Sequence, residues 1–197
     1  MSQLSFFSAE SMPPAVADLT GLLAAPGQVV LVGGDGQHRA ARISVVVDHP
    51  WRAEAIAEMI TAAGLIAQIT RTEEDTPLVG AEADPRLCGI AAEWTRGAVK
   101  TVPVDWSIGP RELRLWTLAA GRPDSAGYLL GLDPHAPDTY SPLASALMRI
   151  GIAPTLIGTR GHHPALRITG RRRLFRLVEV VGEPPGRTEA FVQWPRG

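Results

Sequence analysis

The chain has 197 residues, a formal net charge of −1 and 45% hydrophobic residues, which is typical of a globular protein with one large or two small domains. No apolar run approaches the roughly 20 residues that a membrane helix needs, and the first residues lack the basic and apolar regions of a signal peptide. Cys88 is the only cysteine, which excludes an internal disulfide and favours a cytoplasmic location.

The first half of the chain predicts a repeat of helices and strands behind a flexible N-terminal arm at residues 1–13. A helix is expected where Val16, Leu19 and Leu23 recur on one face, and Pro26 ends it. The later strands are predicted from alternating apolar residues, and the later helices from apolar stripes that end in glycine. Within a first repeat at 14–103, the expected elements are strands at 28–32 and 41–48, a helix at 50–63, strands at 66–72 and 78–81, and a helix from 84 or 85 through 96.

A linker at 104–110, rich in proline and glycine, precedes a second repeat at 111–183, and a tail at 184–197 is expected to be extended. The repetition is visible at Leu19–Gly27 and Leu113–Gly121, each a short apolar helix that ends in glycine, and the clearest alignment sets residues 59–69 beside residues 147–157. Two copies of this size favour a pseudo-two-fold fold. The expected elements of the second repeat are a helix at 111–120, a strand at 127–132, a helix at 142–150, strands at 154–160 and 165–169, and a helix at 171–181.

These two helices and the order of elements resemble the LAGLIDADG homing-endonuclease family. Residues 141–152 resemble the family's helix that ends in Leu-Gly-Ile, and residues 165–182 resemble its last strand, turn and helix. The resemblance covers about residues 14–183. It implies an α+β fold of two pseudo-symmetric αββαββα-type repeats with antiparallel, saddle-shaped sheets. The regulator WhiA carries a similarly degenerate domain, and the arginine-rich composition is typical of a high-GC bacterium.

The resemblance also bears on catalysis. In the nucleases of this family, the residue before the final glycine of each signature helix is an acidic metal ligand. Here Pro26 and Ala120 stand at those positions, and neither offers the oxygen ligands that Mg²⁺ requires. Asp133 and Asp138, in a proline-rich loop, are expected to serve turn and capping roles. The expectation is therefore a non-catalytic protein without a metal or cofactor.

Charge and strand polarity favour DNA as a partner. Residues 139–178 hold seven arginines and no acidic residue, a charge of +7 in a chain whose net charge is −1. In the family, the polar strand faces lie in the DNA major groove, where Arg and Gln pair with guanine and adenine edges and Thr contacts the thymine methyl. Four of the arginines (Arg160 and Arg171–Arg173) are expected at phosphates. The predicted DNA-binding residues are Arg42, Ser44, Gln68, Thr70, Thr155, Thr159, Arg160, Arg167, Thr169, Arg171, Arg172 and Arg173.

Three alternatives remain open on the sequence alone. Thr and Arg also suit an ordinary solvated sheet. Val46, Tyr128 and Leu130 would add apolar character to the open face, which favours a protein-interaction module. A β-α-β pattern from Val45 to Thr70 would also suit a ferredoxin-like domain that senses a small molecule. The expected partner is double-stranded DNA, with a protein partner as the alternative, no membrane, and a monomer or weak dimer in solution.

Overall fold

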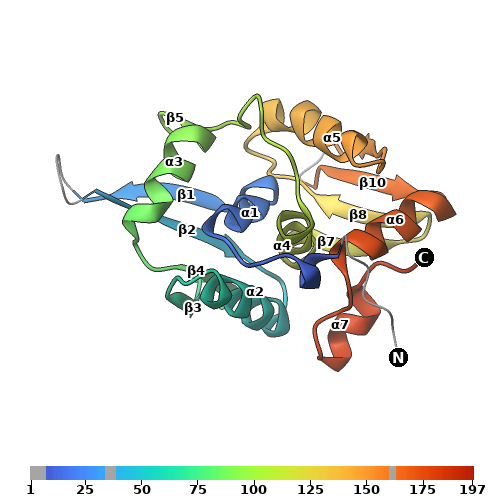
Figure 1. The fold of residues 1–197 in the computed structure, drawn as a ribbon, viewed down its shortest axis with the longest axis horizontal. Helices are drawn as coiled ribbons and strands as arrows, with labels where there is room; N and C mark the ends of the chain where they lie inside the picture. The colour runs from blue at the N-terminus through green and yellow to red at the C-terminus, as the bar shows by residue number, and fades with distance from the viewer. Residues whose placement is uncertain (1–7, 34–38, 160–162) are drawn as a thin grey trace.

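The computed structural model describes residues 8–33, 39–159 and 163–197 and consists of two halves with the same order of elements (Figure 1). Pro50 and Pro110 each occupy the first position of a helix, where the missing backbone N–H leaves no hydrogen bond unmade. The first half contains a 3₁₀ turn (Val16–Leu19), α1 (Thr20–Ala24), β1 (Gln28–Val32), β2 (Ala40–Val46), α2 (Pro50–Ala62), β3 (Ala67–Arg71), β4 (Pro77–Ala81) and α3 (Cys88–Trp94). The second half contains α4 (Pro110–Ala120), β7 (Gly121–Asp124), β8 (Gly127–Gly131), α5 (Tyr140–Arg149), β9 (Thr155–Ile157), β10 (Ala165–Thr169) and α6 (Arg171–Val181).

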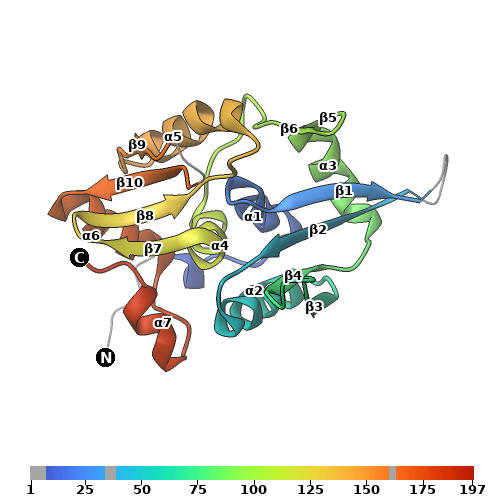
Figure 2. The ribbon, with the colours of Figure 1, turned by 180° about the vertical axis from the view of Figure 1, so that it is seen from behind.

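Each half builds one four-stranded sheet, and the two sheets have the same topology. Their strand orders are β1-β2-β4-β3 and β7-β8-β10-β9, and all neighbouring strands are antiparallel. On each sheet, one face carries buried side chains such as Ile43 and Val45 or Leu166 and Ile168, and the helices cover that face. Figure 2 views the molecule from the strand side, with the two sheets next to each other. The predicted α+β fold of two αββαββα-type repeats is confirmed.

The two helices that end in glycine pack against each other between the sheets, as the resemblance implied. A side chain at Gly21 would collide with the backbone of Glu112, so glycine allows α1 and α4 to approach closely. Trp116 does not disturb this contact. Its ring is fully buried, and its Nε1 donates to the carbonyl of Gly131 at 2.8 Å, toward β8. The interface between the halves is therefore a helix pair at the centre of the molecule (Figure 1).

The pairing registers make positions of the two halves equivalent. Gln28 directly follows the glycine that ends α1, and Arg122 follows the glycine that ends α4. Gln28 pairs with Ser44 of β2, and Arg122 pairs with Leu129 of β8. Gln28 and Arg122 therefore occupy the same place in their sheets, next to the central helices.

The described part of the expected N-terminal arm is docked instead of flexible. Ser8 and Ala9 are buried, and Glu10 accepts a hydrogen bond from the backbone N–H of Glu183 at 2.9 Å. Glu10 also pairs with Arg114 on α4 at 3.0 Å. Long-range contacts therefore order this segment, which has no periodic pattern of its own to signal them.

The expected extended tail contains a further helix, α7 (Thr188–Gln193). Tertiary contacts hold it: the Tyr128 hydroxyl donates to the Gln193 carbonyl at 2.9 Å, and the buried Trp194 donates from Nε1 to Gly182 at 2.8 Å. The prolines and glycines around it hid this short helix in the sequence. The tail is therefore part of the folded unit.

Three strand assignments also differ from expectation. β7 was not expected because it contains Pro123, but β7 is an edge strand, where a missing N–H costs no ladder bond. The helix expected through Arg96 ends at Trp94, and a hairpin of β5 (Thr95–Arg96) and β6 (Val99–Lys100) follows it. β9 ends at Ile157, three residues before the expected limit.

The ferredoxin-like alternative does not match the topology. A β-α-β unit is present as β2-α2-β3, but β1, joined to β2 as a hairpin partner, completes its sheet. A ferredoxin-like sheet would be completed by a strand that follows a second helix. In the part of the chain that the structure describes, no helix is long and apolar enough to span a membrane.

Candidate nucleic-acid interface

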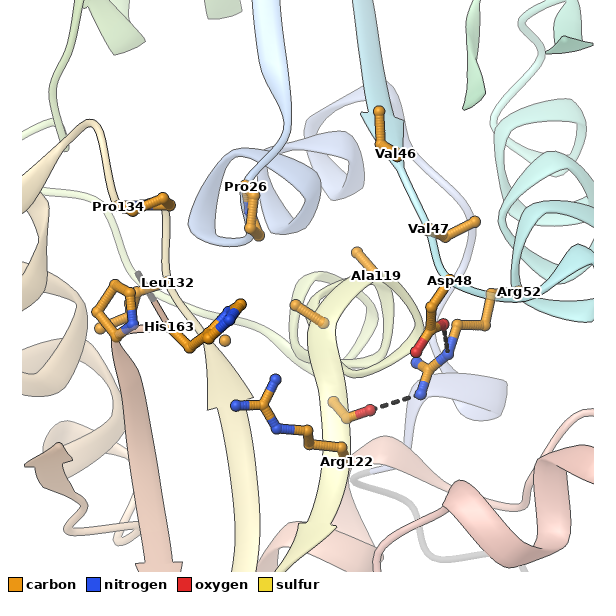
Figure 3. Close-up of a pocket in the computed structure, with 14 residues that line it drawn as sticks. Pro26, Val46, Val47, Asp48, Arg52, Ala119, Arg122, Leu132, Pro134 and His163 are labelled. Atoms are coloured by element: carbon orange, nitrogen blue, oxygen red, sulfur yellow. Dashed lines mark hydrogen bonds and ion pairs between the residues drawn. The ribbon is translucent and has the colours of Figure 1, made fainter. Parts of the chain in front are cut away.

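The C-terminal ends of α1 and α4 meet at the centre of the molecule and open into a depression of about 260 Å³ (Figure 3). Pro26 and Ala120, the residues before the two helix-ending glycines, both line it. Residues at the ends of β2 and β8, together with Arg52, Arg122, His163 and Pro164, also line it. This depression is the place where the resemblance put the metal ligands of the nucleases.

A buried arginine caps the C-terminal end of α4. Arg52 of α2 is 2% exposed and donates to the carbonyls of Leu118 at 2.7 Å, Gly121 at 2.6 Å and Thr117 at 3.2 Å. Its Nε lies 2.8 Å from Oδ1 of Asp48. A cation is favourable there because the carbonyls at a helix C-terminus carry partial negative charge. Arg52 therefore donates to the carbonyls of Leu118 and Gly121 and adds a second donor at the Thr117 carbonyl, which also accepts from the backbone N–H of Gly121.

A buried lysine does the same at α1. Lys100 of β6 donates from Nζ to the Ala25 carbonyl at 3.0 Å and lies 2.7 Å from Oδ2 of Asp133. Gln28 and the backbone N–H of His135 also donate to this carboxylate. Burial alone would raise the pKa of Asp133, but the bonds and charge of Lys100, with the two other donors, hold that pKa below its ordinary value. Burial lowers the pKa of Lys100, and Asp133 opposes that shift.

The two arrangements are related by the pseudo-symmetry. Asp48 and Asp133 each lie four residues beyond the strand partner of Gln28 or Arg122, so they occupy equivalent positions. Each aspartate holds a cation against the C-terminal carbonyls of the helix from the other half. The sequence prediction gave Asp133 a local turn role, and its bond to Lys100 adds a contact between the halves that only the fold reveals.

The open face of the first sheet carries the polar residues predicted for it. Gln28, Ser44, Gly80 and Gln68 follow one another across the four strands and therefore share a face. Arg42 lies on that face two residues before Ser44. The same alternation puts Thr70 and the half-exposed Val46 on this face. Gln68 donates to a carboxylate oxygen of Glu82 at 2.6 Å.

The open face of the second sheet carries more charge. Arg122, Leu129, Arg167 and Thr155 follow one another across β7, β8, β10 and β9, and Thr169 shares their face. The Nε of Arg167 forms an ion pair of 2.8 Å with Asp124. Arg122 was missed by the sequence prediction, because its strand was not recognised.

Two apolar residues lie on the opposite face from the one expected. Tyr128 and Leu130 are 2% and 0% exposed, and they belong to the core side of the second sheet. Leu129, between them, faces the open side. Side chains alternate along a strand, so an assignment shifted by one residue exchanges the two faces. Val46, by contrast, is exposed as expected.

The remaining predicted residues that the structure describes lie beyond the two ends of β10. Thr159 follows Ile157, which pairs with Ala165 at the start of β10, whereas Arg171–Arg173 follow its last residue, Thr169. Thr159 is exposed in the turn after β9, and Arg160 lies outside the described residues. Arg171, Arg172 and Arg173 are exposed and form the first turn of α6. They therefore lie in the helical layer beside the end of β10 (Figure 1). They are not on the strands that form the open face.

The two repeats and the paired central helices define a LAGLIDADG-like fold. The homing endonuclease I-WcaI bound to its DNA recognition sequence has a TM-score of 0.57 at 11% identity, over 92% of this chain and 83% of that one. The N-terminal LAGLIDADG domain of DUF199/WhiA has a TM-score of 0.56 at 14% identity, over 88% and 83%. I-DmoI in complex with DNA and Ca has 0.57 at 15% identity, over 89% and 94%. No protein-family model matches the sequence, and the curated proteins give no match.

The centre does not fit the divalent metal that this fold implies. Mg²⁺ and Ca²⁺ need oxygen ligands, and Pro26 and Ala120 supply no side-chain oxygen. Asp48 is the one carboxylate among the described residues that line the depression, and Arg52 holds it in an ion pair. Throughout the described ranges, no three His, Cys, Asp or Glu side chains are grouped to hold a metal ion.

Proposed function

We propose that the chain is a non-catalytic DNA-binding protein with a regulatory role, which acts in the cytoplasm. The central depression is the observation that carries this proposal. Pro26 and Ala120 flank it without a metal ligand, and the carbonyls at the helix ends are taken up by Arg52 and Lys100. The fold shared with I-WcaI bound to its DNA recognition sequence supports duplex DNA as the partner.

The open faces of both sheets supply the contacts of this proposal. Arg42 and Gln68 on the first sheet, and Arg167 on the second, have the donor groups that pair with purine edges in the major groove. Threonines beside them offer methyl groups to thymine. The arginines that begin α6 would meet phosphates beyond the end of β10, and Thr159 and Arg160, which precede β10 in the chain, would add further contacts. Ser44 and Thr169 complete the set.

A salt-dependent titration tests the proposal. Fluorescence anisotropy with a mixed-sequence duplex at about 50 mM salt should show binding that weakens linearly in a log–log plot as salt increases. Arg167→Gln should weaken binding, whereas Arg96→Gln, which removes an exposed arginine on the distant β5 hairpin, should not. Absence of affinity at about 50 mM salt would exclude DNA binding.

A second candidate function rests on exposed apolar side chains. Val30 and Val46 on the open face of the first sheet are 53% and 48% exposed, which suits a protein partner or a second copy. Mass measurement in solution tests this alternative. A monomer whose mass does not change over a wide concentration range would exclude a second copy of the chain as the partner. For the oligomeric state itself, we propose a monomer or weak dimer.

A further inference from the structure

The central depression is lined by a cationic side chain, Arg122, that the metal chemistry of the fold does not explain. Among the residues that the structure describes, four charged or titratable side chains line it: Asp48, Arg52, Arg122 and His163. Figure 3 shows the Arg122 guanidinium and the His163 ring directed into the depression from one side, while Asp48 and Arg52 are bonded to each other on the other side.

The charges in the depression do not cancel. The charge of Asp48 is balanced by Arg52, and no ion pair joins Asp48 to Arg122 among the described residues. The pseudo-symmetric equivalent of Arg122 is Gln28, which is bonded to Asp133 at 2.8 Å. Among the described residues, no hydrogen bond or ion pair joins Arg122 to another side chain, and Arg122 is exposed. The depression therefore offers one unneutralised guanidinium to solvent.

The helix ends would ordinarily repel an anion at this place, because C-terminal carbonyls carry partial negative charge. Here Arg52 takes up three carbonyls of α4 and its following glycine, and Lys100 takes up that of Ala25 at the end of α1. The two buried cations thus remove the repulsion that the fold would create. What remains is a hollow with a guanidinium and an imidazole on one wall.

We propose that this depression binds a phosphate group, with Arg122 as the charged donor and His163 as a second donor. A guanidinium matches a phosphate with two parallel N–H groups. The group can come from the DNA backbone or from free phosphate. The first source rests on the proposed function, and it would place a backbone phosphate between the two sheets without a metal ion.

Two assays on the full chain distinguish the sources. In the first, Arg122→Gln should weaken duplex binding several-fold and lower the slope of log affinity against log salt by about 0.9. Arg122→Lys should keep the slope, and Arg96→Gln should change neither quantity. In the second, inorganic phosphate is titrated calorimetrically into the wild type, Arg122→Gln and His163→Gln. Arg122 and His163 are both exposed, so these variants are expected to fold.

Each outcome decides between the claims. A reduced slope without binding of free phosphate assigns the site to the DNA backbone. Binding of free phosphate that Arg122→Gln abolishes supports the site even if the wild type binds no DNA, in which case only the proposed function fails. Wild-type DNA affinity and slope in Arg122→Gln, together with no phosphate binding, would overturn the phosphate site and leave the proposed function standing.

Discussion

The first and second sheets differ at the open-face positions that their registers make equivalent. Where the second sheet has Arg122 and Arg167, the first has Gln28 and Gly80. The core faces do not differ in this way, because both are filled by apolar residues such as Val79 on β4. The covered faces of both sheets are apolar because they pack in the core. The open faces do not pack in the core, so their polar and charged residues can differ between the halves.

The same comparison holds at the centre. Each half contributes an aspartate that fixes a cation on the partner helix, but the cations differ. Arg52 comes from a helix and pairs with Asp48, whose side chain is 64% exposed. Lys100 comes from a hairpin and pairs with Asp133, whose side chain is 4% exposed. Equivalent positions therefore support caps of different burial, and the two should respond differently to mutation.

The largest expected effect follows removal of Lys100. Lys100→Met leaves the Asp133 carboxylate buried without its cation, which should cost about 3–5 kcal/mol of unfolding free energy. Urea denaturation measures this loss. Asp133→Asn in the same chain should recover part of it, because the buried charge is then gone. No recovery in the double variant would contradict the ion-pair account.

Removal of Arg52 should cost less. Arg52→Met removes the Arg52 donor from the carbonyls of Leu118 and Gly121, whereas the Thr117 carbonyl keeps the backbone N–H of Gly121, and this loss should cost about 2–4 kcal/mol. The Asp48 side chain is already 64% exposed and stays solvated without Arg52, so adding Asp48→Asn should change the unfolding free energy little. If that second change restored as much stability as Asp133→Asn restores in Lys100→Met, the difference between the two caps would be refuted.

The next largest loss of stability is expected where the central helices α1 and α4 approach closely. Gly21→Ala places a methyl group against the backbone of Glu112 and should destabilise the protein by about 1–3 kcal/mol. The control is Gly89→Ala in α3, where a methyl group meets no atom within 4 Å, and which should be neutral or slightly stabilising. Equal thermal shifts for the two variants would show that the helix contact is not tight.

The pH dependence should be the smallest effect. The pKa of Asp133 is lowered in the folded protein, so its contribution to stability is complete above the unfolded value of about 3.9. That contribution is lost as the pH falls through this value toward the lower folded one. Between about pH 6 and pH 3, Asp133→Asn should lose less stability than the wild type. Asp138→Asn, an exposed aspartate in the same loop, should follow the wild-type curve.

Local patterns in the sequence were enough for much of the fold. Glycine after α1, α4 and α6 marked the helix ends, and the strand Ala165–Thr169 was predicted with its observed bounds. Patterns failed where a distant contact decides the structure. α7 exists because Trp194 packs into the core and Tyr128 bonds to its last residue, and neither contact is visible in a local window.

The site divides in the same way. Pro26 and Ala120 could be assigned by their spacing from a glycine. Arg52 and Lys100 could not, because each caps a helix far away in the chain. Arg122 was not predicted as a site residue because Pro123 argued against a strand there. The sequence did contain a signal for it, since Arg122 follows Gly121 as Gln28 follows Gly27.

DNA binding with and without a divalent metal tests the central claim most directly. Anisotropy titrations of one duplex in Mg²⁺ and in a chelator should give the same affinity at matched ionic strength, and the duplex recovered from Mg²⁺ or Mn²⁺ should be intact. Cleaved DNA, or binding that requires the metal, would contradict the account of a metal-free centre capped by Arg52 and Lys100.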